Sequence, residues 1–113
     1  MNNHNLVIKV PSEIKIGAHT YKIWFDEREE DGDYKGSTLH RKREVLLNPL
    51  LHKQDLRITY LHEVMHILSD AYNQKMPEDE VGVMAQALGV FLYNNLGIEL
   101  DFSNIPQRKI QGR

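Results

Sequence analysis

One short segment of the chain has residue types and spacing that favour metal chemistry: His62-Glu63-Val64-Met65-His66. Histidines four residues apart lie on one face of an α-helix, one turn from each other, so both imidazoles can turn toward one ion. Glu63 follows the first histidine and reaches the same region without having to bind the metal. A zinc hydrolase uses this arrangement, in which the carboxylate takes a proton from a metal-bound water.

The flanking sequence predicts that this motif lies on a helix. Residues 50–76 contain neither Gly nor Pro, and we expect the helix to run from near Asp55 to near Asn73. Apolar residues recur there at spacings of three and four, which predicts one apolar stripe: Ile58, Leu61, Val64, Met65, Leu68, Ala71 and Tyr72. The histidines fall at the edge of this stripe, between core and cleft. The alternative is a surface helix with two half-exposed histidines and a solvated glutamate.

A second helix is predicted to begin at Pro77 and to end at residues 94–97. Pro suits the first helical position, and the acidic residues 78–80 suit the positive end of the helix dipole. Its apolar stripe comprises Val81, Met84, Ala85, Leu88, Phe91 and Leu92. Because the link between the two helices is short, we expect an antiparallel pair.

The third metal ligand is less clear from the sequence. Catalytic zinc sites usually have three protein ligands, and no third histidine stands near the motif. Glu78 and Glu80 lie near the two edges of the second apolar stripe, whereas Asp79 points away. An antiparallel pair brings this turn close to His66, and we prefer Glu78, with Glu80 left open. Asp70, four residues beyond His66, could orient a histidine or bind the metal itself.

The remaining pattern predicts the fold class. Four segments read as strands, at residues 14–16, 20–25, 34–40 and 44–48, and their short connections favour an antiparallel sheet. With 113 residues, 41% of them hydrophobic, the chain fits a single small domain over residues 1–113. We expect an α+β fold, a small antiparallel sheet packed on two antiparallel helices. The polar tail, residues 103–113, is left open between disorder and an edge strand.

Composition argues against several classes of protein. A formal net charge of −2 gives no electrostatic reason to expect a nucleic-acid partner. The chain has no cysteine, which leaves no disulfide and no thiolate metal site. No signal peptide or transmembrane segment is evident, so we expect a cytoplasmic protein without a membrane partner. The oligomeric state is not specified by these patterns.

The motif helix and the helix after it carry a resemblance to a known family. Leu-His-Glu-Val-Met-His at residues 61–66 and Pro-Glu-Asp-Glu-Val at residues 77–81 follow a strand that ends Val-Leu-Leu-Asn. This order resembles the small phage and prophage metallopeptidase-like proteins related to the ImmA/IrrE group within the zincins. The resemblance covers roughly residues 14–96, and its specific part is the motif helix.

The resemblance implies a zincin-like fold, a zinc ion bound by His62 and His66, and Glu63 as general base. It also implies a glutamate ligand from the following helix. The related group often carries this glutamate three residues before an Ala-Asn pair, a position that is Gly82 here. Either the ligand has moved a turn earlier, to Glu78 or Glu80, or the site is incomplete.

Two functions fit these observations. The first is a zinc-dependent metallopeptidase, with Zn²⁺ as cofactor, a peptide or protein as substrate, and the segment 34–40 holding the substrate backbone. A histidine near the cleft, or a tyrosine such as Tyr60 or Tyr72, could stabilise the oxyanion. The second is a degenerate zincin that acts as a protein-binding or regulatory module without cleavage.

Overall fold

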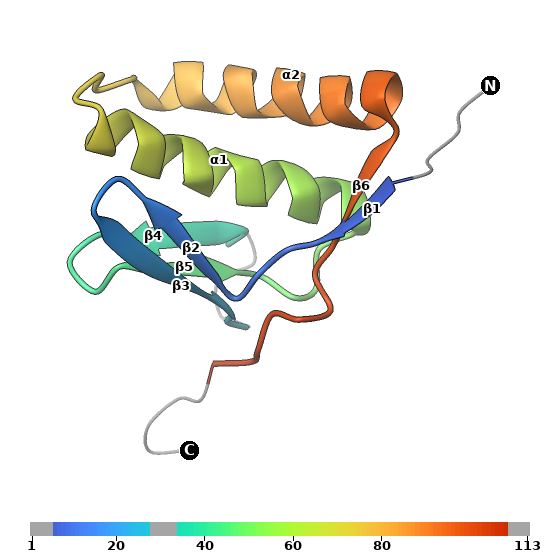
Figure 1. Cartoon of the computed structure of the whole chain (residues 1–113), viewed down its shortest axis with the longest axis horizontal. Helices are drawn as coiled ribbons and strands as arrows, with labels where there is room; N and C mark the ends of the chain where they lie inside the picture. Colours follow the sequence, from blue (N-terminus) through green and yellow to red (C-terminus); the bar gives the residue numbers. More distant parts are fainter. Residues whose placement is uncertain (1–5, 28–33, 109–113) are drawn as a thin grey trace.

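The computed structural model describes residues 6–27 and 34–108 of the chain (Figure 1). Two long helices lie over two small sheets, which confirms the predicted α+β fold. The elements within these residues are β1 (Leu6–Lys9), β2 (Glu13–Ile16), β3 (His19–Phe25), β4 (Gly36–Leu39), β5 (Glu44–Leu47), α1 (Lys53–Ala71), α2 (Glu78–Leu96) and β6 (Ile98–Asp101). Neither helix is long and apolar enough to cross a membrane, as judged over these residues.

The four-stranded sheet has the order β2-β3-β5-β4, and the prediction of an all-antiparallel sheet is wrong. The pairs β2–β3 and β4–β5 are antiparallel, but β3 and β5 are parallel. Residues 26–35 separate β3 from β4, which is enough chain to reach the far edge of the sheet. A tight turn with Arg43 at φ 54° then returns β5 between β3 and β4. This leaves β4 at the edge.

A second, two-stranded parallel sheet joins the two ends of the described chain. Leu6 of β1 pairs with Ile98 of β6, and Lys9 pairs with Asp101. The sequence pattern did not predict β6. The tail beyond it runs along β3, where Phe25 N–H donates to Pro106 O (2.9 Å) and Arg108 N–H donates to Phe25 O (2.8 Å). Of the tail 103–113, residues 109–113 lie outside the described part.

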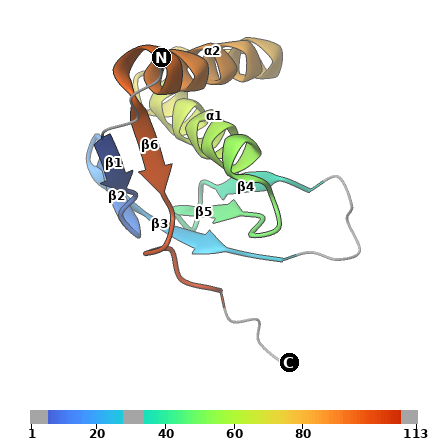
Figure 2. The ribbon, with the colours of Figure 1, turned by 90° about the vertical axis from the view of Figure 1, so that its right-hand side faces the viewer.

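Helix α1 lies between the four-stranded sheet and α2 (Figure 2). Its sheet side buries Leu56, Thr59, Glu63 and Ile67, at spacings of three and four. The predicted stripe is a different face. Its first members contact α2, and its last members are exposed, Tyr72 among them. A helix covered on two sides has no single apolar stripe, so hydropathy alone selected only one of its two buried faces.

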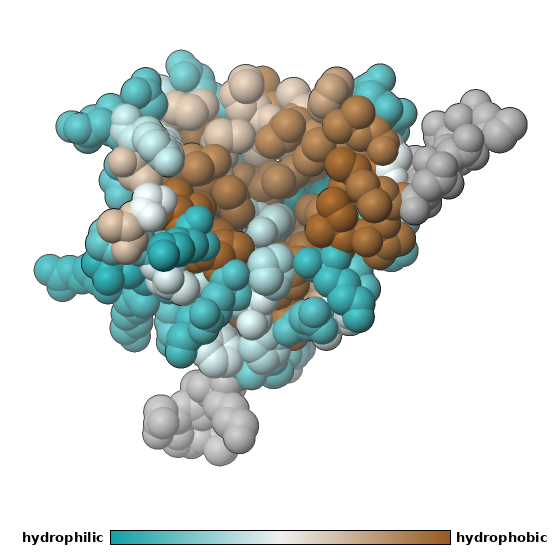
Figure 3. Space-filling view, viewed as in Figure 1, coloured by the Kyte–Doolittle hydropathy of each residue, from teal (hydrophilic) through white to brown (hydrophobic). Residues whose placement is uncertain are grey.

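Helix α2 runs antiparallel to α1, as predicted, and packs mainly against it. Val81, Ala85 and Gly89, one turn apart, form its buried side. Met84 and Phe91, expected in the core, are about half exposed at 48% and 49%. Apolar surface therefore remains on the outer side of the helix pair (Figure 3). The helix ends as predicted at Gly97, whose left-handed φ of 65° suits glycine.

Candidate metal centre

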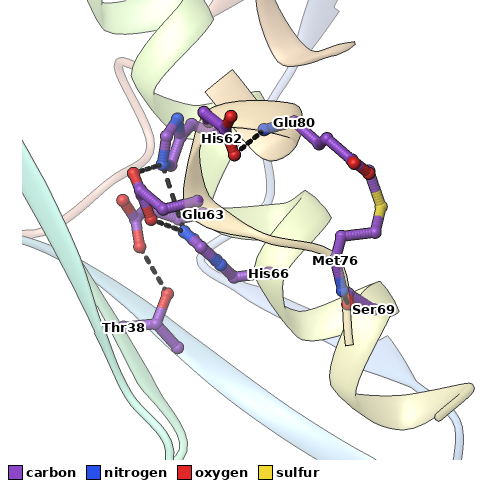
Figure 4. A network of polar contacts seen from close by, with 9 residues as sticks. Thr38, His62, Glu63, His66, Ser69, Met76 and Glu80 are labelled. Atoms are coloured by element: carbon purple, nitrogen blue, oxygen red, sulfur yellow. Dashed lines mark hydrogen bonds and ion pairs between the residues drawn. The ribbon is translucent and has the colours of Figure 1, made fainter. Parts of the chain in front are cut away.

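Three of the predicted site residues converge where α2 begins beside α1. His62 and His66 come from α1, Glu78 is the first residue of α2, and their ligand atoms all lie within 4.8 Å of one another. Glu78 Oε2 is 2.9 Å from His62 Nε2, and its Oε1 is 2.9 Å from His66 Nε2. The two Nε2 atoms are 3.1 Å apart. Figure 4 shows both imidazoles turned to the same side of α1.

The link between the helices fixes where Glu78 lies. Past the end of α1, Asn73 takes a left-handed φ of 61°, and Met76 N–H donates to Ser69 Oγ at 2.8 Å. The chain is thereby folded back along α1. Gly82, one turn after Glu78, faces His62, since a Cβ built on it would lie 3.8 Å from His62 Cε1. The position that the related family often gives to its glutamate is therefore next to the site but has no side chain.

Hydrogen bonds alone satisfy only two of the three contacts in this cluster. If both Nε2 atoms carry a proton, both donate to Glu78, but the two N–H groups then face each other across 3.1 Å. If one Nε2 is unprotonated, its lone pair faces a carboxylate oxygen. A cation that accepts three lone pairs fits every contact. Tetrahedral zinc places its ligand atoms about 3.3 Å apart, close to the 3.1 Å between the two Nε2 atoms. Glu78 meets the two histidines through different oxygens, so its carboxylate would have to turn for one oxygen to join them.

Glu63 lies beside the histidines but is not part of the ligand cluster. The Glu63 side chain faces β4, and the residue is 7% exposed. Thr38 Oγ1 donates a hydrogen bond to Glu63 Oε1 at 2.6 Å (Figure 4). Gly36 permits this close approach, because a Cβ there would lie 2.7 Å from Thr59 Cγ2 and 2.9 Å from Leu46 O. The carboxylate is therefore held between the motif helix and the edge strand.

The alternative third ligands lie elsewhere. Asp70 Oδ2 is 4.0 Å from His40 Nδ1, at the end of β4, rather than beside the two motif histidines. The backbone N–H of Glu80 donates to Asp79 Oδ1 within the first turn of α2. Among the described residues only Glu78 joins the two histidines in a cluster of potential ligands. The geometry thus brings Glu78 to the two histidines, and its role as a metal ligand stays a prediction.

The cluster opens into a cleft of about 750 Å³. Its walls come from β4 and the segment before it, from α1, including both histidines and Glu63, and from Glu78. His40 lies at its rim, whereas Tyr60 packs edge-on against Phe102, 5.5 Å away, and burial raises the pKa of its hydroxyl. Within the described chain, neither Tyr60 nor Tyr72 lines this cleft.

Two cleft residues were not singled out from the sequence. Thr38 and His40 both belong to the segment predicted to hold a substrate, but nothing in its pattern indicates which side chains face α1. The register of β4 on β5 determines this, and the tight turn between the two strands fixes that register. No family model, curated protein or solved structure matches the chain.

Proposed function

We propose that the protein is a zinc-dependent peptidase with a zincin-like fold. The observation that carries the proposal is the convergence of His62, His66 and Glu78 in a cleft that also contains Glu63. The groups have separate roles, because two nitrogens and one oxygen bind the metal and a second carboxylate stays available for proton transfer. Three protein ligands and an open fourth position are the arrangement of catalytic rather than structural zinc sites.

The donor set fits zinc better than harder cations. Imidazole nitrogen suits zinc, whereas magnesium and calcium prefer an all-oxygen environment. Zinc held there would lower the pKa of a coordinated water to about 7 and polarise a substrate carbonyl. His62 and His66 would bind through Nε2, the atoms that already point at Glu78.

Glu63 is the general base of this proposal. One of its oxygens, Oε1, accepts a hydrogen bond from Thr38, which leaves Oε2 to take a proton from the attacking water and to pass it to the leaving amine. The same hydrogen bond holds the carboxylate on the side of α1 that faces β4. Thr38 is therefore a positioning residue.

Strand β4 is the proposed docking site for the substrate backbone. It pairs with β5 on one side only, and its residues Gly36, Ser37 and Thr38 line the cleft. An extended peptide can add to such an edge through main-chain hydrogen bonds, which places its carbonyl groups beside the metal ligands. Recognition of this kind depends little on side chains, which suits a chain of 113 residues with few elements to build specificity pockets.

His40 is the proposed donor to the oxyanion. It lines the cleft at the end of β4, and its Nδ1 lies 4.0 Å from Asp70 Oδ2. Nε2 is the other ring nitrogen, and an N–H on it would be free to donate into the cleft. A hydrogen bond to a developing oxyanion would then strengthen as the carbonyl is attacked.

The proposal is tested by metal content and hydrolysis measured on the same samples. Purified protein should contain about one zinc per chain, the stoichiometry of a mononuclear site, and should cleave a fluorogenic unfolded protein. The double variant His62→Ala, His66→Ala should lose both properties and remain folded by circular dichroism. The double variant His19→Ala, His52→Ala is the matched control, because neither of these histidines lies in the cluster.

The outcomes separate the two functions that fit the sequence. Zinc bound equally well by the His62→Ala, His66→Ala variant would place the site elsewhere and end the proposal. Zinc lost in that variant, with no cleavage of any unfolded protein or peptide library by the loaded wild type, would instead favour a protein-binding module without peptidase activity.

A further inference from the structure

A second pocket opens at the other end of the helix pair. Its volume is about 310 Å³, and it shares no lining residue with the metal cleft. The start of α1 contributes Lys53 and Arg57, the end of α2 contributes Tyr93 and Asn94, and β6 contributes Glu99. No part of the proposed peptidase mechanism uses this pocket.

Arg57 is the unusual group in this pocket. Its side chain is 7% exposed, its Nε has no hydrogen-bond partner, and none of the ion pairs among the described residues involves it. Arginine stays protonated in proteins, so burial cannot remove this charge. The guanidinium carbon lies 4.5 Å from the ring centroid of Tyr93, and this cation–π contact compensates part of the lost hydration.

The helix packing explains why the guanidinium lies there. Gly89 of α2 faces Arg57, and a Cβ built on it would lie 3.8 Å from the arginine Nε. Arg57 passes beside Gly89 and reaches Tyr93, one turn further along α2. Arg57 is among the residues that line the pocket, and its Nε, itself buried, has no hydrogen-bond partner among the described residues.

One neighbouring feature adds positive potential, and another is an ion pair without net charge. Lys53 lies at the pocket rim, but Glu99, 2.6 Å away, neutralises its ammonium and raises the lysine pKa. Helix α1 also begins here: its first backbone bond runs from Leu56 N–H to His52 O, and His52 offers no side-chain cap. The N–H groups of residues 53–55 therefore project from the positive end of the helix dipole.

We infer that this pocket binds a small oxyanion, a carboxylate or a phosphate group, with the buried Arg57 guanidinium as its principal partner. A planar guanidinium presents two parallel N–H groups that match either oxyanion, and Tyr93 holds its plane. The N–H groups at the start of α1 add the positive end of a helix dipole, and the Lys53–Glu99 ion pair adds no net charge. The volume admits a small molecule or the acidic end of a peptide, not an extended chain.

The test is a titration of the Arg57 Nε–Hε signal by nuclear magnetic resonance. Inorganic phosphate and acetate are added in separate experiments, with chloride at equal ionic strength as the reference. At least one of the two should shift the signal saturably, with a Kd in the millimolar range expected of a single small anion. Tighter phosphate binding would assign a phosphoryl ligand, and tighter acetate binding would assign a carboxylate.

Variants separate this site from the metal centre. Arg57→Lys keeps the charge but removes the two parallel N–H groups of the guanidinium. The Kd for the anion, measured from the backbone amide signals at the start of α1, should rise at least ~10-fold. Arg43→Lys, in the exposed β4–β5 turn, is the matched control and should bind as the wild type does. The anion should bind with the same Kd to the His62→Ala, His66→Ala double variant. This variant lacks the metal ligands, so binding to it cannot run through a metal ion.

Two results would overturn the inference. One is a wild-type shift that stays linear for both anions up to about 50 mM, well above a millimolar Kd. The other is an unchanged Kd in Arg57→Lys. Either would assign Arg57 a purely structural role on Tyr93, whatever the outcome at the metal centre.

Discussion

The polar groups at the two ends of the helix pair differ in their exposure to solvent and in what they contact. Where α2 begins, His62, His66 and Glu78 point their ligand atoms at one another, and Glu78 is 72% exposed. Where α2 ends, Arg57 is 7% exposed and stacks on Tyr93. The first set reaches out from the helices into a cleft, and the second is part of the packing between them. Chemistry at the first end can therefore change with little cost to folding, whereas the second end is coupled to stability.

The largest expected effect sharpens the description of the metal end. Glu63→Gln keeps the shape of the side chain and its ability to accept the bond from Thr38, but it removes the base. Hydrolysis should fall at least ~100-fold, the low end for loss of a general base. Zinc content and melting temperature should match the wild type. Loss of zinc along with activity would instead make Glu63 a ligand, and Glu80→Gln serves as the control.

The next prediction tests whether the exposed Glu78 can be changed without loss of folding stability. Glu78→Ala should weaken zinc binding ~10-fold or more, the scale seen when a metal site loses a supporting group, while the metal-free protein keeps its stability. Glu80→Ala and Asp70→Ala should bind zinc normally, since neither side chain joins the histidines. Competitive titration with a chromogenic chelator measures all three. A loss in Asp70→Ala alone would move the third ligand onto α1.

A smaller effect is expected from the partner of the general base. Thr38→Val removes the donor to Glu63 and leaves a branched side chain in β4. A hydrogen bond to a charged group contributes about 1.5–3 kcal/mol, and we expect kcat to fall about tenfold with zinc affinity unchanged. Thr20→Val, on the exposed side of β3, should have no effect. Equal kcat values in the two variants would show that Thr38 does not position the base.

The smallest effect compares the two ends directly through one glycine at each. Gly82→Ala places a methyl group 3.8 Å from His62 Cε1, an ordinary contact, and should stabilise the protein by up to about 1 kcal/mol through helix propensity. Gly89→Ala places it 3.4 Å from both Ile58 and Leu61, which should offset that gain. Urea unfolding of the metal-free variants measures the difference. A larger gain at Gly89 would contradict the tighter packing inferred for that end.

The sequence predicted most of what periodicity and spacing can encode. The two helices, their antiparallel arrangement and the left-handed glycine that ends the second follow from local patterns. The structure also brings Glu78 to the two histidines, because a short link places the start of one helix beside the end of the other. These features depend on residues that are close in sequence, or on the pairing of neighbouring elements.

The features that were missed depend on distant segments. The parallel pairing of β3 with β5 needs the crossover after β3, and the pairing of Leu6 with Ile98 joins residues from the two ends of the chain. Alternation within a strand indicates its faces but not its neighbours. No pattern in the sequence predicts that Arg57 is buried, because a charged residue on a helix is usually solvated. Its burial follows from the packing of α1 on α2, which brings its guanidinium to Tyr93.

The exposure of Glu78 has a kinetic consequence. A metal ion held by Glu78 and two partly covered imidazoles would have Glu78, 72% exposed, as its most solvent-exposed ligand. Rotation of that side chain takes nanoseconds and leaves both helices in place. Exchange of the ion would then be limited by ligand dissociation, without any opening of the fold. The fraction of loaded protein would follow the zinc concentration around it, so that the folded apo form persists whenever zinc is scarce.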